Sequence, residues 1–304
     1  MFSTRRRFPA SFAIYPFLLL FPFLGNVFLS QKGVINYMKT YKLVASALLA
    51  GLAVVFQLFN GVVGYPTGFG MTVDLVGLPI LLAFFILGYD SALLVSVLLA
   101  LVIALTAPTG YIGAVTKFTA TIPMFLLPAA LLLSMGKKLD APKLFAGLFT
   151  ILLILVGMFA VSAYSTDYAK GIAGKDSLLV GILPVAVIAI SAYAFSRVWE
   201  RYGKKASTSM LSKVHVAIPA LFLAVVVRGA LMAVTNLYFA GPIFFGMSPT
   251  DFIAFVDSVK LPFIGSVPWF AVIFFWNAVQ GIAEFALAWI IAYRFGFAKR
   301  YAAQ

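Results

Sequence analysis

The sequence predicts an all-α polytopic membrane protein, and three observations lead to that class. Of the 304 residues, 63% are hydrophobic and 10% are charged, whereas a soluble globular chain is about 45–50% apolar and about 25% charged. The apolar residues gather in runs close to the length of a membrane-spanning helix, about 20 residues. Within the runs they are continuous rather than alternating with polar residues, which favours helices over a membrane β-barrel.

Eight apolar segments are predicted to cross the membrane. In chain order they cover residues 42–63, 75–88, 91–107, 113–135, 143–164, 178–199, 216–240 and 269–294. The second segment is shorter than a full span, so we expect it to be tilted or to have its ends covered by neighbouring helices.

Basic residues in the loops predict how these spans are oriented. Clusters of Lys and Arg precede the first segment and follow the fourth, sixth and eighth, so with eight spans they all lie on one side. The opposite loops contain only Lys170, Lys175 and Lys260. Because basic loops stay in the cytoplasm, we expect a protein of the cell membrane in which both ends of the eight-helix body are cytoplasmic. Because the basic residues are divided among several loops instead of forming one patch, the net charge of +13 does not indicate a nucleic-acid partner.

Residues 1–37 do not fit this body and are treated as an extension of a transmembrane domain at 38–304. The apolar stretch 10–29 follows Arg5, Arg6 and Arg7. If it spans, either every later segment inverts or three arginines cross the membrane. Three interpretations stay open: a gene start placed too early, with Met38 the true first residue; an interfacial helix; or a targeting segment.

Four ionisable residues inside the predicted spans are candidates for a functional site, because charge in a bilayer is costly. Asp74 lies at the outer mouth of the second segment and Lys117 near the outer end of the fourth. Lys117 either contacts a solute or extends to the outer interface. Arg228 and Glu284 fall at similar depths on the antiparallel last two spans. We predict that they form a buried, structural ion pair, whose loss would be costly.

Three carboxamides form a second predicted layer, outside this pair. Asn236 follows Arg228 by eight residues, and Asn277 precedes Glu284 by seven, so each spacing is about two helical turns. Gln280 shares the face of Asn277. Asp74 and Glu284 are expected at different depths.

This amide layer predicts a binding site for a neutral, planar, hydrogen-bonding solute. Carboxamides both donate and accept hydrogen bonds, and the nearby rings of Tyr238 and Trp276 can enclose a planar solute. The alternative is that the amides only join helices to one another. Asp74 and Lys117 are included as candidate solute-binding residues.

Small residues in the first segment allow another helix to approach closely. Ala47, Ala50 and Gly51 are the residues concerned. They face either a partner subunit or a neighbouring helix of the same chain.

Other chemistries lack their sequence signals. The chain has no cysteine and a single histidine, His215, which argues against disulfides and thiolate or histidine-rich metal sites. A phosphate-binding GxxxxGK[ST] loop, HExxH and GxSxG are all missing from the sequence. We therefore expect no enzymatic activity and no metal.

Four stretches resemble the substrate-binding S components of energy-coupling factor (ECF) vitamin transporters. They are TVDLVGLPILLAFFILG at 72–88, TGYIGAVTKFTATIP at 109–123, AVTNLYFAGPIF at 233–244 and FWNAVQG at 275–281. The last two are similar to riboflavin-specific members, and the match covers roughly 42–135 and 213–294. The resemblance implies a six-helix core, without enzymatic activity or a covalent cofactor, that binds a vitamin from outside. It implies docking, by the small-residue face around Ala47 and Gly51, on a shared transmembrane subunit with two ATPases.

Two departures from this family carry consequences. Residues 143–199 look like an inserted helix pair, which preserves the orientation of the later spans. The lysine that follows the Asn in this family is replaced here by Gln280, so only Asn236 and Asn277 carry over as flavin contacts. The expected ligand is riboflavin or a related flavin. The alternatives are a stand-alone secondary transporter, with Asp74 and Glu284 coupling ions or protons, and an intramembrane enzyme acting on lipid.

Overall fold

The computed structural model describes residues 40–135, 186, 188–197, 199–200 and 208–298. The chain divides into two compact units, Met1–Ala45 and Ser46–Gln304. In the first, the described residues 40–45 are helical; all other described residues belong to the second. The N-terminal extension 1–37 and most of the predicted inserted pair 143–199 lie outside the described residues.

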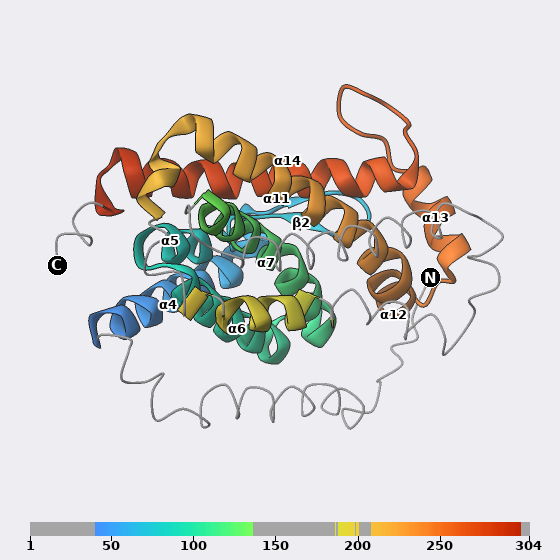
Figure 1. Cartoon of the computed structure of the whole chain (residues 1–304). Helices are drawn as coiled ribbons and strands as arrows, with labels where there is room; N and C mark the ends of the chain where they lie inside the picture. The colour runs from blue at the N-terminus through green and yellow to red at the C-terminus, as the bar shows by residue number, and fades with distance from the viewer. Residues whose placement is uncertain (1–39, 136–185, 187, 198, 201–207, 299–304) are drawn as a thin grey trace. The chain divides into compact units, whose positions relative to one another are not determined.

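Five apolar helices in the described residues are long enough to cross a membrane (Figure 1). They are α4 (Thr40–Val63), α6 (Tyr89–Thr106), α7 (Gly110–Met135), the helix that begins with α11 (Val214–Thr235), and the helix that begins with α14 (Trp269–Trp289). They correspond to the predicted first, third, fourth, seventh and eighth spans. The described chain thus has the architecture of an all-α polytopic membrane protein.

The seventh span is longer than predicted. After α11 the chain makes a π-helical turn, η4 (Asn236–Ala240), and continues through α12 (Gly241–Phe245), so one helix runs over Val214–Phe245. The predicted segment ended at residue 240, before Pro242, and proline usually terminates a helix. The π turn, whose hydrogen bonds join residues five apart, connects Gly241 N–H to the Asn236 carbonyl and lets the helix pass Pro242.

The second predicted segment is a half-length helix. Helix α5 covers Leu78–Leu87, about 15 Å at 1.5 Å per residue and half of the hydrocarbon core. It ends at Gly88, whose φ of 106° is open to glycine and turns the chain directly into α6. Nine of its ten residues are buried, so neighbouring helices cover it.

A short hairpin precedes α5 and departs from the all-helical pattern. Strands β1 (Tyr65–Pro66) and β2 (Thr72–Val73) pair antiparallel, with Tyr65 opposite Val73. Thr67 closes the turn, since its backbone N–H and hydroxyl both donate to the Met71 carbonyl, at 2.9 and 2.8 Å. The sequence predicted only a turn-rich outer loop here; the structure places β2 alongside α14 (Figure 1).

The remaining helices position the site between them. Helix α7 packs against α6 and α11, and α11 packs against α14. The outer connection contains α13 (Pro249–Asp257), and α14 ends in a second π turn, η5 (Ile290–Arg294). At that end, a 3-10 turn, η3 (Thr208–Ser212), accepts hydrogen bonds from Trp289 and Tyr293.

Candidate functional site

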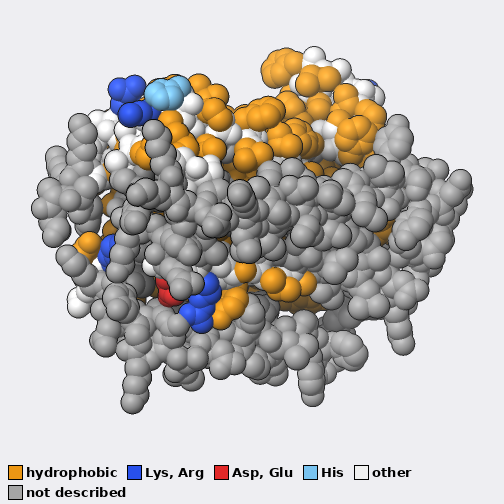
Figure 2. All heavy atoms as spheres, viewed as in Figure 1, with side chains coloured by type: hydrophobic (Ala, Val, Ile, Leu, Met, Phe, Trp, Pro, Cys, Tyr) orange, Lys and Arg blue, Asp and Glu red, His pale blue; other side chains and the backbone are white. Residues whose placement is uncertain are grey.

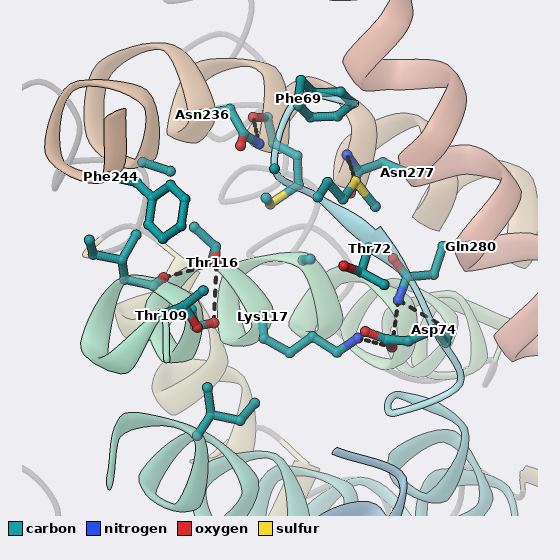
Figure 3. Close-up of a pocket in the computed structure, with 18 of the residues that line it drawn as sticks. Phe69, Thr72, Asp74, Thr109, Thr116, Lys117, Asn236, Phe244, Asn277 and Gln280 are labelled. Atoms are coloured by element: carbon teal, nitrogen blue, oxygen red, sulfur yellow. Dashed lines mark hydrogen bonds and ion pairs between the residues drawn. The ribbon is translucent and has the colours of Figure 1, made fainter. Parts of the chain in front are cut away.

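A cavity of about 170 Å³ lies between α4, the hairpin, α7, α11 and α14. Phe69, Met71, Met232, Phe244 and Phe245 supply much of its apolar wall. Its polar lining combines hydroxyls, amides and charges, which are Gln57, Asn60, Thr72, Asp74, Thr109, Thr116, Lys117, Arg228, Asn236, Asn277 and Gln280. Figure 3 shows many of these side chains around the same space.

The carboxamides are the most selective feature of this lining. The described residues contain five Asn and Gln side chains, and all five line this cavity: Gln57, Asn60, Asn236, Asn277 and Gln280. Helix–helix contacts elsewhere in the described residues therefore contain no Asn or Gln side chain. A distribution set only by helix association would scatter amides over several interfaces, so their concentration makes the cavity the candidate site of the described residues.

Two acidic and two basic side chains form a continuous cluster, of which Asp74, Lys117 and Arg228 line the cavity. Lys117 Nζ lies 2.5 Å from Asp74 Oδ1 and 3.6 Å from Glu284 Oε1, and Arg228 Nη1 lies 2.9 Å from Glu284 Oε2. The side chains of Arg228 and Glu284 are each 1% exposed. The predicted Arg228–Glu284 pair is confirmed, and the formal charges of the cluster sum to zero.

Gln280 joins the two carboxylates rather than forming a separate layer. Its amide nitrogen lies 2.9 Å from Asp74 Oδ1 and 3.1 Å from Glu284 Oε1, as Figure 3 shows for Asp74. The prediction that Asp74 and Glu284 lie at different depths is therefore wrong. It placed Asp74 at the outer mouth of a regular helix, whereas the extended backbone before α5 carries Asp74 inward.

The start of α5 approaches Glu284 closely enough to hydrogen-bond it. Gly77 N–H donates to Glu284 Oε1 at 3.0 Å, and a Cβ on Gly77 would lie 2.5 Å from the same oxygen. The positive end of the α5 dipole thus faces a buried carboxylate, which stabilises its charge. Glu284 is fifteen residues into α14, about 22 Å along its axis, so non-helical backbone reaches deep into the membrane-spanning layer.

Asn277 and Asn236 line the cavity from two different helical elements, α14 and η4. Asn277 is buried and donates to the Ile273 carbonyl at 2.9 Å, with Arg228 Nε 3.5 Å from its oxygen. Asn236 begins the π turn and donates to the Met232 carbonyl at 2.8 Å. The predicted two-layer arrangement is thus replaced by one polar surface, since Asn277 contacts the cluster and only Asn236 stands apart. Single π turns often occur at functional sites.

Tyr238 and Trp276 do not line the cavity. Both belong to a buried hydrophobic cluster with members from the hairpin, α11, η4, α13 and α14. The Trp276 ring lies 5.3 Å from that of Tyr65 on the hairpin. They support the cavity wall from behind, and Phe69 and Phe244 provide aromatic faces to the cavity instead.

Sequence reasoning missed the contribution of α4 and of the start of α7. Gln57 and Asn60 are three residues apart near the end of α4, and Thr109 and Thr116 flank the first turns of α7. Polar residues one turn apart in an apolar segment share a face, and this signal was available for Gln57 and Asn60. The Asn60 oxygen is buried and has no hydrogen-bond partner among the described residues.

The small residues of the first segment are divided between two faces of α4. Ala47 and Gly51 are exposed, whereas Ala50 lies with Ser46 and Ala53 on the buried face. Ser46 and Ala50 share a side of the helix because they are four residues apart. Ala50 therefore packs within this chain and cannot contact a partner subunit.

Comparisons with known proteins add no family assignment. No protein-family model, no characterised protein and no solved structure matches the chain significantly.

Proposed function

We propose that this protein is the solute-binding membrane subunit of a vitamin uptake system of the ECF type. The observation that carries the proposal is the gathering of all five described carboxamides around one cavity. Amides with aromatic and thioether walls suit a planar heterocycle that both donates and accepts hydrogen bonds. Irregular backbone at membrane depth, as in the hairpin and the start of α5, is typical where it lines a cavity.

The charge of the cluster favours an uncharged solute. Its two carboxylates and two cations neutralise one another within hydrogen-bonding range. A charged ligand would have to displace one partner and leave the other buried and unpaired, at a cost of about 3–5 kcal/mol. Riboflavin or a related flavin, whose ring system is neutral, fits this requirement and the resemblance of residues 233–244 and 275–281 to riboflavin-specific members.

The cavity as it stands is too small for a whole flavin ring system. A volume of about 170 Å³ is close to the roughly 150 Å³ of an engineered cavity that holds one benzene ring. A tricyclic flavin therefore needs the cavity wall to move. The hairpin is the part of that wall whose backbone is not helical, so we expect it to move. Gly70, with a φ of 88°, lies against the Phe245 ring at this wall.

The proposal includes the membrane arrangement and the partners. Eight spans place both ends of residues 38–304 in the cytoplasm, and a shared transmembrane subunit with two ATPases supplies the energy. The exposed pair Ala47 and Gly51 on α4 is the proposed docking contact.

Titration of riboflavin with the purified protein tests the ligand. Binding is expected to quench flavin fluorescence, and Asn277→Ala should weaken it about tenfold, the equivalent of one lost buried hydrogen bond of about 1.4 kcal/mol. Ser96→Ala is the matched control, because Ser96 is buried but does not line the cavity. If mass spectrometry instead finds a different vitamin co-purifying, the flavin assignment is wrong and the class stands; if no vitamin binds, the class is wrong.

The sharing of Lys117 between Asp74 and Glu284 supports a second candidate, a stand-alone secondary transporter. Protonation of one carboxylate would release the lysine to the other, and intramembrane carboxylates of this kind serve as proton relays in transporters. Solute flux driven by a pH gradient in vesicles that contain this chain alone would favour it, and its absence would favour the ATPase-dependent system.

A further inference from the structure

The connection between α13 and α14 contains a tight turn with two exposed apolar side chains at its tip. Leu261 and Gly265 exchange backbone hydrogen bonds of 2.9 and 3.0 Å around Pro262, Phe263 and Ile264. The Phe263 side chain is fully exposed, and that of Ile264 is 58% exposed.

Phe263 is held in a backbone conformation that its residue type disfavours. Its φ is 65°, and it is the only non-glycine residue with a positive φ in the described ranges 40–135 and 208–298. A turn with proline at its second position and a positive φ at its third ordinarily takes glycine or asparagine there. A large aromatic residue in a strained and exposed position is a reason to look for a function.

The turn stands beside the membrane-spanning helix and not beyond its end. In Figure 1 the loop after α13 projects to the side of α14, and Figure 2, from the same direction, shows hydrophobic side chains gathered in that region. Asp257 ties the loop to the helix, because its Oδ1 accepts a hydrogen bond from Trp269 N–H at the first residue of α14. The side of a membrane helix near its end is occupied by lipid headgroups and the first acyl carbons.

We propose that the tip formed by Phe263 and Ile264 inserts into the outer interface of the lipid bilayer. Interfacial segments bury Phe and other apolar side chains at the boundary between headgroups and acyl chains. The exposed Lys260 beside the tip can bind headgroup phosphates while its stem follows the apolar surface. At the start of α14, Phe270 is a further apolar side chain that is 40% exposed. Insertion anchors the outer loop that follows Phe245, which is part of the cavity wall.

A fluorescent label on a single introduced cysteine tests this placement. Because the chain has no cysteine, Phe263→Cys labelled with an environment-sensitive dye reports one position, and Asp251→Cys on α13, exposed and charged in the native chain, is the matched control. In phosphatidylcholine vesicles the label at 263 should emit at shorter wavelength and be quenched by lipids carrying a spin label near the headgroup. The label at 251 should instead be quenched by aqueous iodide.

Two outcomes would overturn the proposal. Iodide quenching at 263 equal to that at 251 would place the tip in water. Shielding from both iodide and spin-labelled lipid would place it against protein. A second variant, Phe263→Asn, keeps the turn without the apolar tip, since asparagine tolerates positive φ; it should fold normally and, labelled at Ile264→Cys, lose at least half of the lipid quenching.

Discussion

At the scale of single residues, Gly77 shows how closely the site is packed. Its missing side chain lets the start of α5 approach the Glu284 carboxylate, and its own φ of −78° is ordinary for any residue. The requirement for glycine therefore comes from the neighbour and not from the backbone. This separates Gly77 from Gly88, where the requirement is the positive φ itself.

Gly77→Ala should consequently destabilise the protein by overpacking. We expect a loss of about 1–3 kcal/mol in the free energy of unfolding, measured by titration with a denaturing detergent in mixed micelles. Gly51→Ala is the control, because nothing lies within 4 Å of a Cβ there and alanine is the better helix former by up to about 1 kcal/mol. Equal stabilities for the two variants would contradict the observed contact.

The ion pair predicts an asymmetric response to the loss of either partner. Arg228→Met leaves Glu284 with Lys117, Gln280 and Gly77 N–H, whereas Glu284→Met leaves Arg228 with only the distant Asn277 oxygen among its described contacts.

Glu284→Met should therefore cost about 3–5 kcal/mol, and Arg228→Met less. The double variant should recover much of the loss, since a well-packed apolar pair can replace a buried ion pair. A double-mutant cycle on unfolding in mixed micelles measures this coupling, and strictly additive losses would rule it out.

At the scale of elements, the hairpin and α5 form one interrupted segment, which the eight-span proposal counts as a crossing. The chain passes from β2 through extended residues to a helix of half length, and the break lies where the cavity and the charge cluster meet. Neighbouring α14 satisfies the interrupted backbone through Glu284, and Asp74 accepts from Val76 N–H at 2.9 Å. The break is thus compatible with the membrane, because its polar groups face protein and a cavity instead of lipid.

The hairpin should be stabilised locally by Thr67. Thr67→Ala removes its partly buried hydroxyl bond to the Met71 carbonyl, worth about 1 kcal/mol. The change should raise amide hydrogen exchange over residues 65–73 several-fold without changing global unfolding. Thr106→Ala, which removes an exposed hydroxyl bond within α6, serves as the control. Unchanged exchange in the hairpin would mean that the turn does not depend on Thr67.

At the scale of the whole molecule, the basic loops predict a single orientation. Ser266, after the apolar turn, should face outside, and Ser212, beside the basic residues before α11, should face the cytoplasm. Both are exposed. In intact cells a membrane-impermeant maleimide should label Ser266→Cys, and Ser212→Cys should react only after permeabilisation. The reverse labelling pattern would mean that the eight-helix body has the opposite orientation. Residues 10–29 could then be a further span with Arg5, Arg6 and Arg7 in the cytoplasm.

Several features of this protein could be predicted from local information in the sequence. Apolar runs and loop charges determine the membrane class and the expected sides, because the transfer of a helix into lipid depends on its own composition. The Arg228–Glu284 pair followed from counting turns along two long regular helices, where a rise of 1.5 Å per residue makes depth calculable.

Other features were decided only by the tertiary structure. Asp74 and Glu284 both contact Lys117 because the backbone that carries Asp74, just before α5, is not helical. A segment of this kind has no periodicity from which its depth can be calculated. The hydrogen bond from Gly77 to Glu284 joins residues 207 positions apart. Membership of the cavity likewise depends on how α4, α7, α11 and α14 face one another, which is why Gln57 and Asn60 belong to the site and Tyr238 and Trp276 stand behind it.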